Sequence, residues 1–161
     1  MQTTARAVVI GGGVVGCSVL YHLAKFGWTD SVLLERDELT SGSTWHAAGG
    51  MHTINGDPNV AKLQKYTIDL YKEIEALSGQ PTGLHLTAGV MLAATEARFD
   101  WLKSTVAKGR YLGIDAKIIT PERAHELMPL LDPSCFVGAL ETVVDGHLDP
   151  SGTTQAYAKA A

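Results

Sequence analysis

Three glycines near the start of the chain constrain its fold more than any other feature. The pattern Gly11-x-Gly13-x-x-Gly16 follows a short apolar run at 5–10, read ARAVVI, and opens a helix-forming segment at 14–26. In a parallel βαβ unit the first glycine permits a tight turn, the second lets the backbone approach a pyrophosphate, and the third lets helix and strand pack closely. The sequence therefore predicts a dinucleotide-binding turn.

A second apolar run at 31–35, read SVLLE, completes the βαβ unit, whose crossover should be right-handed. The run ends on Glu35, and Arg36 follows at the same edge. A carboxylate in that place accepts hydrogen bonds from ribose hydroxyls and repels a 2′-phosphate, so FAD or NAD is favoured over NADP. Free N–H groups and the helix dipole near Val14 and Val15 favour the negative charge of a pyrophosphate.

Composition excludes several classes of protein. With 161 residues, 45% hydrophobic and 19% charged, the chain has the size and make-up of one globular domain. Its net charge is -4 with both signs mixed along the sequence, which argues against a nucleic-acid partner. No apolar run approaches the roughly 20 residues of a membrane span. Cys17 and Cys135 form no disulfide framework, and Cys17 is expected in the core. We expect a cytoplasmic protein, or one of the mitochondrial matrix if a transit peptide has been removed.

The rest of the chain predicts a mixture of helices and short strands. Expected elements are a helix from Asp57-Pro58 to Gly79, two strands around a turn within 83–94, a helix from Thr95 to Leu112, a strand at 118–119, a short helix from Thr120, a strand at 135–142 and a last helix from Asp149. The fold class is therefore α/β, with a Rossmann-like βαβ unit and flavin loop at 1–56, and 57–161 leading into an α+β substrate domain. Because no strand follows the last helix, we expect an N-terminal piece of a longer protein.

A long irregular loop follows the second strand, and such loops are usually functional. Its centre, TSGSTWHAAGG at 40–50, is rich in small residues that let backbone lie against a flat ligand. Ser43 and Thr44 offer hydroxyls for phosphate or ribityl oxygens, and Trp45 offers an apolar plane. His46, in mid-loop, is by itself open to either a structural or a chemical role.

Four segments resemble successive parts of one enzyme family. They read VVIGGGVVGCSVLYHLAKFGW, VLLERDELTSGSTWHAAGG, ITPERAHELMPLL and DGHLDPSGTTQAYAKAA. They are similar to the dimethylglycine and sarcosine dehydrogenase family, which belongs to the D-amino-acid-oxidase-like FAD enzymes of glutathione-reductase type. The resemblance covers essentially the whole chain and departs from the family at Gly50, where a large aliphatic residue is usual.

The resemblance implies that His46 bonds covalently to the 8α-methyl carbon of the flavin, which requires a ring nitrogen free of its proton. It also implies oxidation of an N-methyl C–H bond of dimethylglycine, sarcosine or a related amine, with two electrons passing to the flavin. An electron-transfer flavoprotein or oxygen would accept the electrons. The one-carbon unit would leave as formaldehyde or pass to tetrahydrofolate in a C-terminal domain. Substrate-binding groups of the family lie mostly later in the chain, so no catalytic acid or base is assigned.

The predicted FAD-binding residues come from the glycine turn, the end of the second strand and the histidine loop. They are Gly11, Gly13, Val14, Val15, Gly16, Glu35, Arg36, Gly42, Ser43, Thr44, Trp45, His46, Ala47, Ala48, Gly49 and Gly50.

The remaining histidines are weaker candidates. His52 and His85 are candidates to approach the flavin or substrate, whereas His22 and His125 are expected to be structural and His147 to shape a turn. No His, Cys and carboxylate spacing suits a metal. Two alternatives stay open: a nicotinamide-dependent Rossmann enzyme, and a non-catalytic regulatory relative of the same fold.

Overall fold

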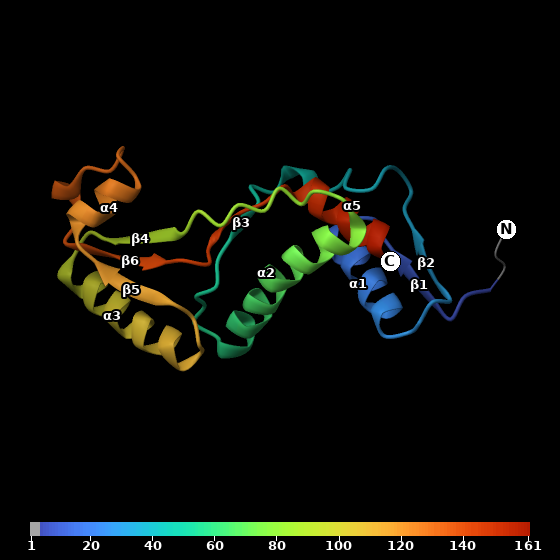
Figure 1. Ribbon diagram of the computed structural model, residues 1–161, viewed down its shortest axis with the longest axis horizontal. Coiled ribbons are helices and arrows are strands. Elements are labelled where there is room, and N and C mark those ends of the chain that lie inside the picture. The colour runs from blue at the N-terminus through green and yellow to red at the C-terminus, as the bar shows by residue number, and fades with distance from the viewer. Residues whose placement is uncertain (1–3) are drawn as a thin grey trace. The chain divides into compact units, whose positions relative to one another are not determined.

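The computed structural model describes residues 4–161, and Figure 1 shows its elements along the chain. They form two compact units, the first comprising residues up to 50 with 68–85 and 147–161, and the second comprising 51–67 and 86–146. The strands are β1 (Ala7–Ile10), β2 (Ser31–Leu34), β3 (Gly50–Met51), β4 (Gly89–Ala93), β5 (Ala116–Ile119), β6 (Gly138–Thr142) and β7 (Gly146–His147). The helices are α1 (Val14–Lys25), α2 (Pro58–Ser78), α3 (Glu96–Tyr111), α4 (Pro121–Leu127) and α5 (Pro150–Ala160), with 3₁₀ turns η1 (Thr44–His46) and η2 (Pro133–Cys135).

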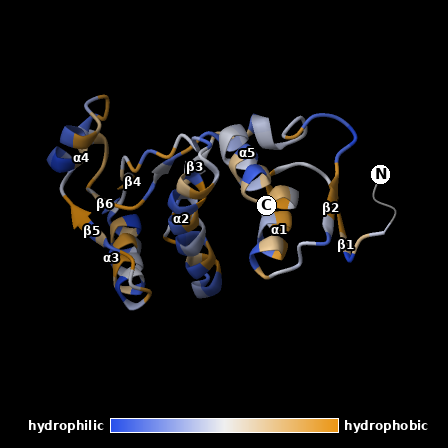
Figure 2. Ribbon diagram, turned by 45° about the vertical axis from the view of Figure 1, so that its right-hand side comes forward, coloured by the Kyte–Doolittle hydropathy of each residue, from blue (hydrophilic) through white to orange (hydrophobic). Residues whose placement is uncertain are grey.

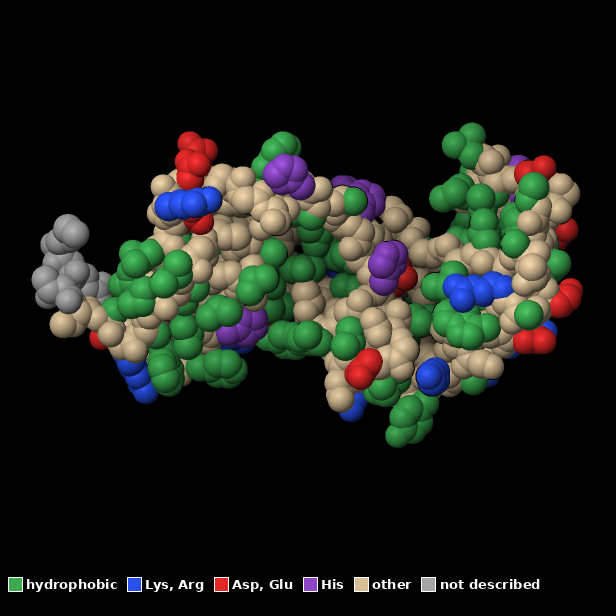
Figure 3. Space-filling model, turned by 180° about the vertical axis from the view of Figure 1, so that it is seen from behind, with side chains coloured by type: hydrophobic (Ala, Val, Ile, Leu, Met, Phe, Trp, Pro, Cys, Tyr) green, Lys and Arg blue, Asp and Glu red, His purple; other side chains and the backbone are tan. Residues whose placement is uncertain are grey.

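The predicted βαβ unit is confirmed in the first unit. Strands β1 and β2 pair in parallel, with Ala7 opposite Ser31 and Ile10 opposite Leu34, and α1 connects them. Both strands are apolar (Figure 2), as expected for strands of a parallel sheet that is covered on both faces. Ile10 is nevertheless 86% exposed and Leu34 54% exposed, and Figure 3 shows hydrophobic side chains gathered at the surface of the unit that carries the N-terminus.

The core of the first unit joins three helices that are distant in sequence. Its buried members come from α1, from the second half of α2 and from α5: Cys17, Tyr21, Leu70, Ile74, Ala156 and Tyr157. Cys17 is fully buried, which confirms its expected core position. The last helix starts where predicted, because the Asp149 side chain accepts a hydrogen bond from the Ser151 N–H. It thus completes the core around α1.

The second unit is a three-stranded antiparallel sheet with helices. The strand order is β4-β6-β5, so β6 is central, and α3 packs on the sheet through Leu102 and Val106. Helix α3 begins after Thr95, whose side chain accepts from the Arg98 N–H, and α4 begins after Thr120 in the same way. Both helix starts agree with the sequence predictions.

The prediction of two strands within 83–94 is wrong. Only β4 forms there, and its antiparallel partner is β6, with Gly89 opposite Thr142 and Ala93 opposite Gly138. His85 instead makes an isolated bridge with His147. The sequence of this segment indicated extended chain but carried no information about which distant segment supplies the partner strand.

Three smaller expectations also need correction. The strand expected at 135–142 begins at Gly138, because Asp132 caps the 3₁₀ turn η2 by accepting from Ser134 N–H. His147 lies in the short strand β7 and not in a turn. The loop expected to be irregular up to Gly56 contains η1 and β3.

Candidate cofactor site

The glycine turn has the close contacts that its pattern requires. Gly11 has φ +109°, a conformation that side chains other than glycine rarely adopt, and its N–H donates to the Leu34 carbonyl at 2.8 Å. A Cβ added at Gly16 would lie 1.9 Å from the Gly11 carbonyl oxygen. The third glycine therefore lets α1 start directly against the turn that ends β1.

Glu35 closes onto this turn from the end of β2. Its Oε2 accepts from the Gly12 N–H at 2.6 Å, while Oε1 accepts from the N–H groups of Arg36 at 2.7 Å and Asp37 at 3.0 Å. These hydrogen bonds lower the pKa of Glu35, with Gly12 as the largest cause and Asp37 next. The carboxylate is therefore ionised at neutral pH. Sequence reasoning missed Gly12, whose only signal was its place between two glycines.

Thr44 ties the histidine loop to the start of α1. Its Oγ1 accepts from the Val14 N–H at 3.0 Å, and the residue is only 8% exposed. Within residues 4–161 the Thr44 hydroxyl proton has no hydrogen-bond acceptor. One buried hydroxyl thus accepts from the helix N-terminus and keeps a free donor beside it, at the end of a helix where anions bind.

The His46 ring is held by the backbone of its own loop. Its Nδ1 lies 3.0 Å from the Gly42 carbonyl oxygen. Because a carbonyl can only accept, this contact requires the proton on Nδ1 and leaves the Nε2 lone pair free in the neutral imidazole. The Trp45 ring lies against it, with ring centroids 3.9 Å apart and planes 34° apart. Both side chains are exposed, so Nε2 is open to an external reactant.

The end of the loop packs against the segment before α5. Gly49 has φ +74°, and a Cβ there would lie 2.1 Å from the Leu148 carbonyl oxygen. Helix α5 also contacts η1. All sixteen predicted cofactor residues lie between Gly11 and Gly50, and so in the first unit. The structure brings the glycine turn, Glu35 and the histidine loop together in that unit.

The other histidines take different places. His22 Nδ1 contacts the Ser18 carbonyl and His125 Nδ1 the Leu131 carbonyl, each at 2.7 Å, which agrees with structural roles. His85 stacks on His147 with ring centroids 5.1 Å apart. Across residues 4–161, no three His, Cys, Asp or Glu side chains form a group that could hold a metal ion. None of the helices described there is long and apolar enough to cross a membrane.

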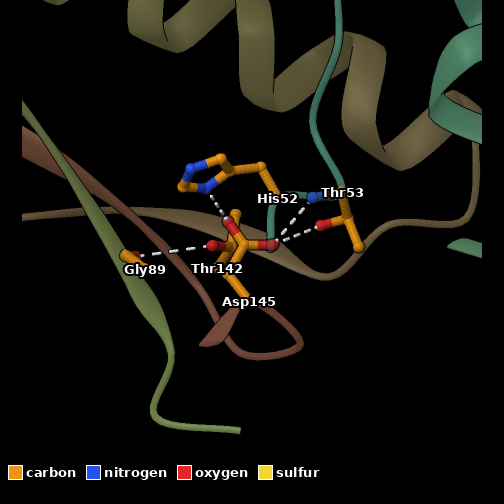
Figure 4. Close-up of polar contacts among 5 residues, drawn as sticks. All are labelled: His52, Thr53, Gly89, Thr142 and Asp145. Carbon is orange, nitrogen blue, oxygen red and sulfur yellow. Dashed lines mark hydrogen bonds and ion pairs between the residues drawn. The ribbon is translucent and has the colours of Figure 1, made fainter. Parts of the chain in front are cut away.

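His52 belongs to the second unit, where it faces a buried carboxylate. Its Nδ1 lies 3.6 Å from Asp145 Oδ2, and Asp145 Oδ1 accepts from both the N–H and the hydroxyl of Thr53 (Figure 4). Thr53 and Asp145 are 92 residues apart. The sequence therefore indicated His52 as a candidate, but no sequence pattern indicated Asp145 as its partner.

Fold and site together have the features of a dinucleotide-binding protein: a glycine turn between the first strand and the helix, and an acid after the second strand. The sequence matches the family described as FAD dependent oxidoreductase over residues 6–161, and the chain belongs to this family. This result favours a flavin over the nicotinamide alternative.

Similar relatives include two dehydrogenases and a regulatory subunit. The chain is 43% identical over 157 residues to mitochondrial dimethylglycine dehydrogenase of Rattus norvegicus, covering 98% of this chain and 18% of the relative. It is 38% identical over 162 residues to human mitochondrial sarcosine dehydrogenase, with coverages of 100% and 18%. It is also 38% identical over 161 residues to the mitochondrial pyruvate dehydrogenase phosphatase regulatory subunit of Mus musculus, again with 100% and 18%. The chain thus spans about a fifth of the length of these relatives.

A solved structure shows the same fold. L-proline dehydrogenase from P. horikoshii superposes with a TM-score of 0.90 at 31% identity, covering 99% of this chain and 42% of that chain. The predicted α/β class and the resemblance to the dimethylglycine and sarcosine dehydrogenases are confirmed.

Proposed function

We propose that this protein oxidises the N-methyl C–H bond of a small amine or amino acid, with FAD attached covalently through His46. The observation that carries the proposal is the free Nε2 of His46, presented in the same unit as the glycine turn and Glu35. When bound, FAD supplies the two-electron acceptor for the reaction.

The residues of the first unit suit an extended dinucleotide. The N–H groups at the start of α1 and the free Thr44 hydroxyl proton would bind the pyrophosphate, while the ionised Glu35 would accept from the ribose. The Gly42 carbonyl holds His46 in the tautomer whose Nε2 is nucleophilic. His46 Nε2 would be the nucleophile that bonds the flavin, and the bound FAD would supply the oxidising power that this attachment requires.

The substrate class is proposed from the relatives. Two of them are named for dimethylglycine and sarcosine, both small N-methylated amino acids. Oxidation of the N-methyl group would give an imine, which would be hydrolysed to release formaldehyde or would pass its carbon to tetrahydrofolate. Either outcome belongs to one-carbon metabolism. An electron-transfer flavoprotein or oxygen would reoxidise the flavin. A cytoplasmic or mitochondrial location stays a prediction.

A regulatory role is the second candidate, because one relative at 38% identity is a phosphatase regulatory subunit. His46 favours the enzyme, since a free nucleophilic Nε2 on a flavin loop serves no evident purpose in a purely regulatory protein.

Anaerobic reduction of the full-length protein tests the choice. Addition of dimethylglycine or sarcosine should bleach the visible flavin band, and the released carbon should be detected as formaldehyde or a folate adduct. A protein that holds flavin but is reduced by no N-methyl amine would support the regulatory candidate.

Glu35→Gln should weaken FAD binding by about tenfold to a hundredfold, because a charge-assisted acceptor for the ribose hydroxyls is lost. The substitution also puts an amide NH₂ in place of one accepting oxygen, opposite either the Gly12 N–H or the N–H groups of Arg36 and Asp37. Calorimetric titration of FAD into apoprotein measures the change. Glu38→Gln, at an exposed position three residues on, is the matched control and should bind FAD normally. Equal affinity of the Glu35 variant and wild type would contradict the assigned role.

Thr44→Val should lower the free energy of unfolding by about 1–3 kcal/mol, because the Val14 N–H loses a buried acceptor. The covalently bound share of the flavin should also fall, since the loop carrying His46 loses its tie to α1. Chemical denaturation and acid precipitation of the flavoprotein measure the two effects. Thr44→Ser should restore both. Thr67→Val is the control, because the Thr67 hydroxyl bonds only a carbonyl of its own helix. Full covalent attachment in Thr44→Val would show that the hydrogen bond from the Val14 N–H to Thr44 is not needed for attachment.

A further inference from the structure

The second unit contains a cavity of about 310 Å³ that the cofactor residues do not line. Apolar side chains form part of its wall: Ile54, Val90, Met91 and Leu140. Asp145 is also in the wall and is only 6% exposed. A carboxylate in such surroundings is costly unless donors satisfy both of its oxygens.

Only one oxygen of Asp145 accepts hydrogen bonds within the described part of the chain, and Figure 4 shows the other oxygen facing His52. Oδ1 accepts from the Thr53 N–H at 2.8 Å and the Thr53 hydroxyl at 2.7 Å. Oδ2 has only His52 Nδ1, at 3.6 Å, which is too long for a hydrogen bond. Gly89 keeps this oxygen uncovered, because a Cβ there would lie 2.8 Å from Oδ2. The cavity wall thus presents a carboxylate oxygen, Asp145 Oδ2, that no donor within residues 4–161 reaches at hydrogen-bond distance.

A second acceptor lies in the same wall. Gln64 lines the cavity, and its Oε1 is buried without a hydrogen-bond partner among residues 4–161. Asp145 Oδ2 and Gln64 Oε1 are both acceptors, so they favour a ligand with a positively charged N–H group. Asp145 would repel an anionic group placed beside it. Apolar side chains around them suit methyl or methylene groups.

We propose that this cavity binds the ammonium group of a small N-methylated amine, with Asp145 Oδ2 as its main acceptor. The methyl groups then contact the apolar wall, and the amine takes the place of His52, whose side chain is 74% exposed, beside Asp145. The choice of an N-methylated amine rests on the proposed function, whereas the binding itself requires no electron transfer.

Calorimetry on the full-length protein tests the proposal with two ligands of the same shape. N,N-dimethylglycine carries an N–H⁺ where 3-methylbutanoate carries a C–H. Reduction of the protein with dithionite under anaerobic conditions prevents turnover of the amine. Wild type should bind dimethylglycine about tenfold to a hundredfold more tightly than 3-methylbutanoate, as expected for a charge-assisted hydrogen bond. Asp145→Asn should abolish this preference.

Three further variants separate binding from stability. Thr53→Val removes a bond to Oδ1 and leaves Oδ2, so it should lower the Tm and keep the preference. Asp132→Asn makes the same change at an exposed capping residue outside the cavity and should also keep it. Gln64→Leu removes the partial negative charge of Oε1 from the cavity wall, so it should reduce the preference for the cationic ligand several-fold, and it decides the matter if Asp145→Asn does not fold.

Two results would overturn the proposal: a wild type that does not discriminate between the ligands, or a preference that survives in Asp145→Asn, or in Gln64→Leu if Asp145→Asn does not fold. Failure of the proposed function looks different. A flavin that no N-methyl amine reduces would leave the calorimetric preference in place, whereas a lost preference with normal flavin reduction would refute only this inference.

Discussion

His46→Ala should leave a flavin that acid releases completely, whereas wild-type protein should stay yellow through acid precipitation. The alanine variant has no Nε2 to bond the 8α carbon, while the glycine turn and Glu35 still hold the other end of the cofactor. Some non-covalent FAD should therefore remain, and activity should fall without vanishing, because the histidyl substituent tunes the ring and does not accept the hydride.

Intact mass of the full-length protein measures this effect directly. Wild type should exceed its sequence mass by one FAD, and the flavin-bearing peptide should contain His46. His125→Ala is the matched control, because His125 is exposed, contacts the Leu131 carbonyl in the second unit and should not affect attachment. Complete release of flavin by acid from assembled wild-type protein would leave His46 with only a hydrogen-bonding role.

Gly16→Ala should abolish tight FAD binding and destabilise the first unit. The new Cβ would lie 1.9 Å from the Gly11 carbonyl oxygen and 3.1 Å from its carbon, which are backbone atoms with little room to move. Relief requires α1 to shift away from the turn, so the N–H groups at its start leave the position that suits the pyrophosphate. Forced overpacking of this kind costs about 1–3 kcal/mol of unfolding free energy, and FAD affinity should fall by more than about tenfold.

Urea denaturation and FAD titration of full-length apoprotein measure the two losses. Gly56→Ala is the control, because a Cβ at Gly56 meets nothing within 4 Å and its backbone is not in the left-handed region. Wild-type affinity in Gly16→Ala would mean that the turn tolerates a shifted helix and does not bind the pyrophosphate through it.

Local signals in the sequence predicted the parts of the fold that depend on neighbouring residues. The start of α5 was predicted from Asp149-Pro150, and the starts of α3 and α4 from Thr95 and Thr120. Each cap is a hydrogen bond between residues two or three positions apart, so the residue types and their spacing are sufficient to indicate it. The glycine turn and the acid at the end of β2 were predicted from a motif about 30 residues long whose spacing is typical of a βαβ unit.

The histidine loop was a prediction of another kind. The residue types alone left the role of His46 undecided, and the resemblance to a family supplied a predicted role. The tertiary structure added the Gly42 contact that leaves Nε2 free, and the Thr44 contact with Val14, which joins residues 30 positions apart. No local pattern encodes that second contact.

By itself, then, the sequence determined the helix starts and the loop that carries His46, because their signals lie in neighbouring residues. It also determined the βαβ unit, because the glycines and the acid match a known motif about 30 residues long. Only the tertiary structure decided that β4 pairs with β6, that Gly12 donates to Glu35, and that Asp145 meets Thr53. These contacts join residues separated by long stretches of chain, and their partners are chosen by packing and by hydrogen bonding in three dimensions.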